Sequence, residues 1–183
     1  MHALDFDYML GLVPILLGYL PLTLEMAAAG MACALVLACL LAVIRVTRIP
    51  GLNAVALLFI SFFRGTPLLV QLFLFYYGLP QVLTFLVAIN GVTATILGLT
   101  LHFSAYMAES IRAAIVGIDR SQTEAALSIG MTRAQLMRRI VLPQATRSVI
   151  PPMMSVLIAL LKNTTVASGF SVVNLGNIRV NMS

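Results

Sequence analysis

Few residues in this 183-residue chain have types and spacings that could carry out chemistry. Its two histidines, His2 and His102, are isolated, and the sequence holds no serine–histidine–aspartate triad, metal-ligand cluster or paired carboxylates. The single lysine, Lys162, is followed by Asn163, so the phosphate-binding loop that ends in Gly-Lys-Ser or Gly-Lys-Thr does not occur. The pattern therefore predicts that the chain is not an enzyme and has no metal site.

A second set of residues is polar and lies within or beside long apolar stretches. Polar groups are costly in such surroundings, so each is a candidate for function. Gln71, His102 and Ser104 could line a pathway for a solute or could make hydrogen bonds between helices. Arg64 has either a structural role near an interface or closes a gate against Glu109. The candidates for a pathway or gate are Arg64, Thr66, Gln71, His102 and Glu109.

The elements that position these residues must lie in a membrane. Hydrophobic residues make up 61% of the chain and charged residues only 9%, against about 45–50% and about 25% in soluble domains. This composition excludes a soluble enzyme, a disordered regulator and a nucleic-acid-binding module. The formal net charge is +5, but the positive charges fall between apolar runs and are typical of loops that set orientation rather than of a nucleic-acid partner.

The apolar runs predict an all-α, polytopic bundle that forms a single transmembrane domain over residues 1–183. A crossing needs about 20 apolar residues. The second run is interrupted at Gly65 and Pro67, so either an interfacial helix precedes a crossing that starts near Arg64 or one crossing is broken there. Turns are expected at Gly78–Pro80 and Asn90-Gly91. Three of the four predicted crossings lie near Leu22–Ile44, Val92–Ala108 and Ser148–Ala167, and the other either starts near Arg64 or is the broken crossing within the run from Leu52 to Tyr77.

Charge sets the expected orientation of these crossings. Arg45 and Arg48 are separated by two crossings from residues 109–147, which carry six arginines and three acidic residues. Both groups therefore lie on one side, and the positive-inside rule places them in the cytoplasm. The N-terminus and the Tyr77–Gly91 loop are then outside.

The cytoplasmic loop contains signals for two short helices. Ser121–Glu124 is a predicted capping box that opens the first helix, and Gly130 is expected to end it. Thr132–Gln135 is a second capping box, opening a helix that runs through Ile140 and ends before Pro143. The pair could be amphipathic surface helices whose arginines contact lipid headgroups, or a surface for another protein.

The spacing within this loop resembles that of a known family. Glu124, Ala125 and Ala126 are followed by Gly130 and then, after nine residues, by the Ile-Val-Leu-Pro run at 140–143. This pattern resembles the EAA loop of ABC-importer permeases. The Ser-Phe-Phe-Arg-Gly-Thr-Pro-Leu run at 61–68 is similar to permeases of the polar amino acid uptake group. The resemblance covers about residues 10–168.

The resemblance implies a MetI-like permease fold with about four spans here where the family has five. It implies a permease subunit of an ATP-driven importer in the bacterial inner membrane, for a polar amino acid or a cystine- or opine-like compound. The implied partners are a second permease subunit (identical or different), a cytoplasmic ATPase, a periplasmic solute-binding protein and the lipid bilayer. This chain itself is expected to bind no cofactor, because ATP and magnesium are bound by the ATPase. By carry-over, the residues that contact the ATPase or anchor the loop are Glu124, Ala125, Ala126, Gly130, Ile140, Leu142 and Pro143.

Residues 169–183 depart from the family pattern, which continues for several tens of residues through a further span. The resemblance therefore implies a truncated tail. Two alternatives to a working permease stay open from the sequence: a membrane interaction protein that transports nothing, and a passive channel.

Overall fold

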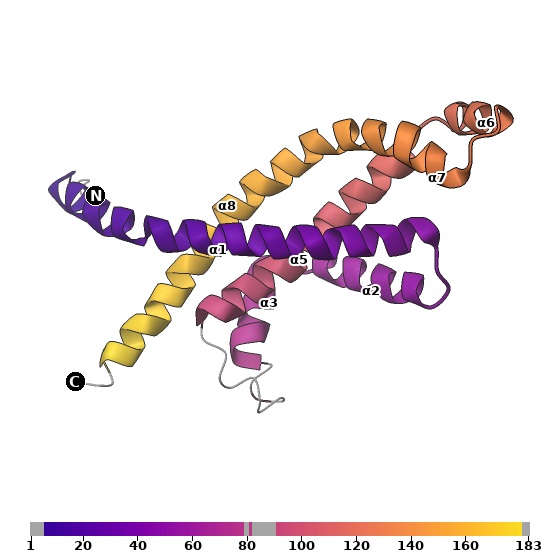
Figure 1. Ribbon diagram of the computed structural model, residues 1–183. Coiled ribbons are helices and arrows are strands. Elements are labelled where there is room, and N and C mark those ends of the chain that lie inside the picture. The colour runs from indigo at the N-terminus through magenta and orange to yellow at the C-terminus, as the bar shows by residue number, and fades with distance from the viewer. Residues whose placement is uncertain (1–5, 79–80, 82–90, 181–183) are drawn as a thin grey trace.

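The structure, a computed structural model, describes residues 6–78, 81 and 91–180 (Figure 1). Every regular element among these residues is a helix, which confirms the predicted all-α fold class. In chain order the elements are α1 (Phe6–Thr47), α2 (Leu52–Gly65), α3 (Leu68–Phe73), the π-helical turn η1 (Leu74–Gly78), α5 (Gly91–Val116), α6 (Arg120–Ser128), α7 (Arg133–Leu136), the π-helical turn η3 (Met137–Val141) and α8 (Leu142–Val180).

Helix α5 is the element around which the others pack, since it contacts α1, α2, α3 and α8. Figure 1 shows α1 crossing it. On α1, Ala27, Ala34 and Ala38 are buried in the core shared with α5, and such small side chains let two helices approach closely. A Cβ added to Gly30 would lie 3.3 Å from the Cβ of Leu99 on α5. The α1–α5 contact is therefore a close one.

By length and composition, fewer helices than predicted qualify as membrane spans. Within the described residues, two helical stretches do so, Leu20–Thr47 and Arg133–Thr164. A third is added if α2 and the segment Leu68–Gly78 are counted as one bent span. Helix α5 contains the predicted crossing Val92–Ala108 and, with 26 residues, is about 39 Å long. It is not among the stretches that qualify.

The predicted interruption of the second apolar run is confirmed. The axes of α2 and the segment Leu68–Gly78 meet at 108°. Thr66, between them, has extended backbone angles (φ −114°, ψ 141°), because the ring of Pro67 disfavours the helical conformation of the residue before it. The chain therefore turns sharply where a straight helix would otherwise continue.

The predicted end of the loop's second helix before Pro143 is wrong. The chain passes from α7 through η3 directly into α8, and Pro143 is the second residue of α8. The N–H of Leu142 donates to the Met137 carbonyl, as in a π-helix, so the hydrogen-bond register shifts just before the proline, which has no N–H of its own. The loop and the last long helix therefore form one helical path.

Some predictions fall on parts of the chain that the structure does not describe. The turn at Gly78–Pro80 and most of the Tyr77–Gly91 loop lie outside the described residues. The backbone of α8 is helical to Val180, so the polar stretch expected after Ala167 continues a helix over its described part.

Helices α3 and α5 touch at a glycine. A Cβ added to Gly98 would lie 2.5 Å from Cδ2 of Leu72, a side chain that is 3% exposed. Real atoms do not approach this closely, so any larger residue at 98 must displace Leu72. The α3–α5 contact therefore depends on the absence of a side chain at this position.

We predict that Gly98→Ile lowers the free energy of unfolding by about 1–3 kcal/mol through overpacking, measured as the thermal midpoint of the detergent-solubilised protein. Gly18→Ile is the matched control, because nothing lies within 4 Å of a Cβ at that helical glycine. Adding Leu72→Ala to Gly98→Ile should recover part of the loss. Equal midpoints for the two single variants would contradict this account of the contact.

Candidate functional site

The first helix of the loop has a different cap from the one predicted. The carboxylate of Asp119 accepts a hydrogen bond from the Ser121 N–H at 2.9 Å, and α6 begins at Arg120. The predicted capping box at Ser121–Glu124 is therefore wrong, because Asp119 already occupies the N-cap position. The hydrogen bond from the Ser121 backbone lowers the pKa of Asp119. The resulting negative charge is favourable at a helix N-terminus.

The predicted end of this helix at Gly130 is confirmed. Gly130 has φ +83°, a conformation that costs residues with a Cβ about 1–2 kcal/mol. Its N–H bonds to the Leu127 carbonyl at 3.0 Å, and the Met131 N–H bonds to the Ala126 carbonyl at 3.1 Å. These two bonds form a Schellman motif, which satisfies the last carbonyls of α6. Nothing lies within 4 Å of a Cβ at this position, so the glycine is needed for its backbone angle and not for space.

The second predicted capping box is confirmed. The Thr132 hydroxyl accepts a hydrogen bond from the Gln135 N–H at 3.2 Å, and the Gln135 side-chain oxygen accepts one from the Thr132 N–H at 2.9 Å. The elbow, defined here as residues 119–144, therefore has hydrogen-bonded caps on both of its short helices.

The elbow has its own small hydrophobic core. Ala126, Leu136 and Val141 are buried together, and Ile140 packs against them. Ala126, expected on a surface for another protein, is only 3% exposed and faces its own chain. Leu142, expected to anchor the loop, is 45% exposed. Leu136 and Val141 were not predicted from the sequence; Leu136 ends α7 and Val141 ends η3, and a spacing of five residues along a π turn places both on one face.

The outward face of the elbow carries other residues of the predicted set. Glu124, Ala125, Gly130 and Pro143 are exposed, and Ile129 is 80% exposed. Figure 1 shows α6 and α7 at one end of the molecule. A further hydrogen bond, from the Gln144 side-chain amide to the Gln122 side-chain oxygen at 2.6 Å, ties α6 to the start of α8. The exposed residues of the elbow, called its tip below, are therefore accessible and partly apolar, and α6 is hydrogen-bonded to the start of α8.

Arginines surround this tip. Arg133, Arg138 and Arg139 are exposed, and a recess of about 620 Å³ is lined by Ala134, Gln135 and the last two of these arginines. Such a surface suits a partner or a membrane surface that carries negative charge.

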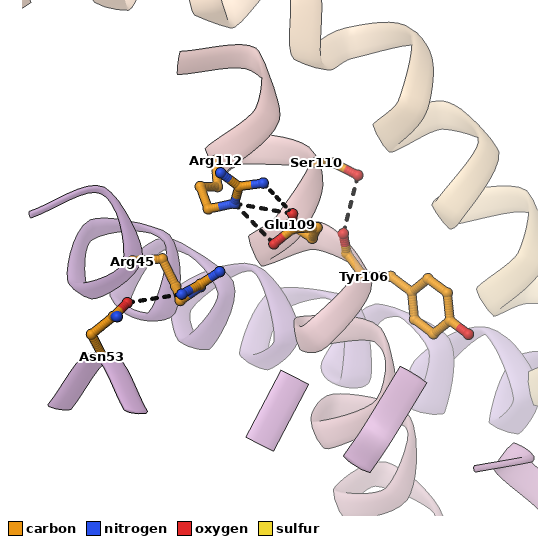
Figure 2. A network of polar contacts seen from close by, with 6 residues as sticks. All are labelled: Arg45, Asn53, Tyr106, Glu109, Ser110 and Arg112. Carbon is orange, nitrogen blue, oxygen red and sulfur yellow. Dashed lines mark hydrogen bonds and ion pairs between the residues drawn. The ribbon is translucent and has the colours of Figure 1, made fainter. Parts of the chain in front are cut away.

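Glu109 is paired within its own helix. The Arg112 Nε lies 3.0 Å from each carboxylate oxygen of Glu109 (Figure 2). Both residues lie beyond the predicted crossing Val92–Ala108. The hydrogen bond from Arg112 lowers the pKa of Glu109, and the positive charges of Arg45 and Arg64 act in the same direction. The carboxylate is therefore held in its charged form by several positive neighbours.

A gate formed by Arg64 and Glu109 is not what this structure shows. The Arg64 guanidinium lies over the Tyr106 ring, 5.4 Å from its centroid, and Glu109 pairs with Arg112. Figure 2 shows the Tyr106 ring pointing away from that ion pair. The gate stays a prediction: in this structure Glu109 is held by a partner three residues along the same helix. Arg45, nearby, donates instead to the Asn53 side-chain oxygen at 2.8 Å.

Gln71, Thr66 and His102 are brought together by the bend after α2. The Gln71 side-chain nitrogen lies 3.0 Å from the Phe63 carbonyl, 3.1 Å from the Thr66 carbonyl and 2.6 Å from the Thr66 hydroxyl. Its side-chain oxygen lies 3.1 Å from Nδ1 of His102 on α5. Both side chains are buried. Of the two roles predicted for these residues, the interhelical hydrogen bond is the one observed. Ser104 bonds within its own helix, to the Leu101 carbonyl.

A cavity of about 330 Å³ lies next to this cluster, between α5 and α8. Its polar lining comes from His102, Tyr106, Ser155 and Asn163. The volume is at the lower end of the range for small-molecule sites. Asn163 and Ser155 donate to carbonyls in their own helix, which leaves their oxygens available to a solute.

Long apolar helices around α5, with a capped and arginine-rich elbow at one end, define an integral membrane protein. Residues 34–172 match the family described as binding-protein-dependent transport system inner membrane component. The chain belongs to this family, the ABC-importer permeases that its EAA loop resembles. The chain is 60% identical over 163 residues to the "Probable amino-acid ABC transporter permease protein PatM" of Vibrio harveyi, covering 89% of this chain and 73% of that protein.

Other known proteins are also similar. The "Probable amino-acid permease protein YxeN" of Bacillus subtilis is 46% identical over 96% of this chain and 78% of its own length. A crystal structure of an amino acid ABC transporter with histidines matches with a TM-score of 0.83 and 36% identity, over 92% of this chain and 77% of that chain. The MetNI methionine ABC transporter matches at 20% identity with a TM-score of 0.65, over 81% of this chain and 71% of that chain, which supports the MetI-like fold alone.

We predict that Thr132→Ala destabilises the elbow locally by about 1 kcal/mol, because it removes the cap of α7. Hydrogen exchange of the amides in residues 132–140 should accelerate about fivefold, while exchange in α5 is unchanged. Thr132→Ser keeps the hydroxyl and is the control. Acceleration of the same size in the serine variant would show that the cap is not the cause.

Proposed function

We propose that this chain is the membrane subunit of an ATP-driven importer for a polar amino acid or a related compound such as cystine or an opine. Relatives support this class of substrate. Besides the two amino-acid permeases above, the "L-cystine transport system permease protein TcyL" of Bacillus subtilis is 40% identical over 94% of this chain and 74% of its own length. The cavity lined by His102 and Asn163 has hydrogen-bonding groups that suit a polar solute.

The proposed assembly contains three kinds of partner in the bacterial inner membrane. A second permease subunit, identical or different, pairs with this chain. A cytoplasmic ATPase binds ATP and magnesium and docks on the elbow. A periplasmic solute-binding protein delivers the solute from outside. Because the sequence lacks a phosphate-binding loop, the energy for transport comes from the ATPase.

The elbow is the observation that carries this proposal. It has capped helices, an internal core and an exposed tip that includes Glu124, Ala125 and Ile129. It joins α5 to α8, so a force on the tip is applied to both long helices. A rigid lever of this kind can bias two arrangements of the bundle. Glu124, Ala125 and Gly130 are the proposed ATPase contacts, while Ala126 and Ile140 support them from within.

The proposed orientation puts the N-terminus in the periplasm and the elbow in the cytoplasm. The end of α1 and the end of α5 lie near one another, since the charge of Arg45 acts on Glu109, and Figure 2 shows the two residues in one neighbourhood. The arginines at the end of α1 and those of the elbow are therefore on one side, as the positive-inside rule requires.

Reconstitution tests the proposed function. The chain is placed in vesicles with its second permease subunit, the ATPase and the solute-binding protein, and uptake of radiolabelled arginine, glutamine and cystine is measured. We expect uptake of at least one solute that requires both ATP and the binding protein. Uptake that continues without the ATPase would indicate a passive channel, and no uptake of any of the three would contradict the substrate class.

We predict that Gly130→Val reduces binding of the ATPase at least tenfold, because valine is disfavoured at φ +83° and the tip of the elbow must rearrange. Gly130→Asn is the matched control, since asparagine tolerates this conformation and should bind within about threefold of the unmodified chain. Co-purification in detergent measures the effect, and membrane insertion should be equal in both variants. Unchanged binding by the valine variant would refute the docking assignment.

A further inference from the structure

At the bend after α2 a backbone carbonyl loses its helical N–H donor, and the side chain of Gln71 replaces that donor. In an unbroken helix the carbonyl of Phe63 would accept the N–H of residue 67, but that residue is Pro67 and has no N–H. The Gln71 amide donates to the Phe63 carbonyl from 3.0 Å instead. Gln71 is 1% exposed, so no water replaces it. The side chain therefore supplies the donor that the proline removes.

Thr66 takes part in the same hydrogen-bond network at the bend. Its hydroxyl donates to the Phe62 carbonyl at 2.9 Å, so the same oxygen is free to accept from the Gln71 amide at 2.6 Å. The Thr66 carbonyl lies 3.1 Å from the same nitrogen, and because the amide has only two N–H hydrogens, one of them is shared between two of the three acceptors. One glutamine thereby connects the last turn of α2 to the first turn of α3 across the 108° bend.

The other end of the Gln71 side chain reaches α5. Its amide oxygen can only accept hydrogen bonds, so Nδ1 of His102, 3.1 Å away, is the donor and carries the proton. In the neutral ring Nε2 is then the unprotonated nitrogen. The same pair of helices makes the close contact at Gly98 and Leu72, four residues before His102 and one residue after Gln71. Two independent contacts therefore join the bend to α5.

We propose that Gln71 is a positioning residue of the transport cycle, which keeps the α2–α3 bend closed by replacing the missing N–H of Pro67 and fastens that bend to α5 through His102. Helix α5 leads directly into the elbow. A displacement of the elbow that moves α5 therefore moves the bend with it. This inference rests on the proposed transport function, but the hydrogen bonds on which it depends can be measured without transport.

The tautomer of His102 is the first measurement. His2 is the only other histidine, so ¹⁵N-histidine labelling of the full chain in bilayers gives two imidazoles, and the variant His102→Gln assigns them. We expect a protonated Nδ1 and an unprotonated Nε2 at His102. Gln71→Leu should abolish this fixed tautomer, whereas Ser104→Ala, which removes a bond internal to α5, should leave it intact. A mixture of tautomers in the unmodified chain would overturn the link to α5.

The second measurement is ATP-driven uptake by the complete reconstituted importer. Gln71→Glu keeps the size of the side chain and an acceptor for His102, but it offers the Phe63 and Thr66 carbonyls at most one donor, the O–H of the protonated acid, where the amide has two. We expect a maximal uptake rate at least tenfold lower with KM unchanged, and ATPase binding as in the unmodified chain. Ser104→Ala should stay within twofold. A normal rate in Gln71→Glu would overturn the role of the cap.

Paired substitutions at His102 separate positioning from packing. His102→Gln keeps a donor for the Gln71 oxygen, whereas His102→Leu keeps only apolar volume in a side chain that is 8% exposed. Positioning predicts a maximal uptake rate at least fivefold higher with glutamine than with leucine at unchanged KM, and packing predicts the reverse; a difference confined to KM would overturn positioning in favour of a contact with the solute. Uptake by the leucine variant that equals or exceeds that of the glutamine variant would overturn the proposal. The two proposals can fail separately. If the unmodified importer shows no uptake but His102 has the expected tautomer, the proposed function is refuted, while the hydrogen bond between Gln71 and His102 is confirmed.

Discussion

The constraint on which the whole structure depends is that backbone groups in a membrane must find their partners within the protein. Water is absent from the hydrocarbon region, and each unsatisfied N–H or C=O there costs several kcal/mol. A helix without proline, such as α5, meets this demand through its own backbone hydrogen bonds. Wherever the helix is interrupted, a side chain has to take over, and Gln71 at the bend before Pro67 is the clearest example. A break and a buried polar residue therefore occur together.

Local features of the fold could be predicted from the sequence because they depend on residues close together in the chain. The apolar runs identified the helices, Gly130 marked the end of α6, and the Thr132–Gln135 box marked the start of α7. The same local reasoning failed at Ser121, where Asp119 offered a competing cap two residues earlier. It also failed at Pro143, because a proline near a helix start can mark a beginning as well as an end.

Features that depend on distant residues could not be predicted. The hydrogen bond between Gln71 and His102 joins residues 31 positions apart, and no periodicity indicates which two helices will meet. The sequence also does not show whether a small side chain faces the core or the surface. Ala125 and Ala126 are adjacent and identical, yet only Ala126 turns toward the core of the elbow. The direction of such a residue is decided by the neighbours that the fold brings to it, here Leu136 and Val141.

The separation of rigid and accessible parts within the elbow bears on how a force could pass through it. Its helix ends are satisfied by its own residues, and its core is completed by Ile115 of α5 and by Ile118, so the elbow does not need a separate partner chain to be ordered. A partner on the exposed tip would therefore meet a preformed surface and lose little binding energy in ordering it. The bond from Gln144 to Gln122 closes the elbow across its base. Movement of the tip is then more easily accommodated by tilting α5 and α8 than by deforming the elbow, and α5 contacts α1, α2 and α3 as well.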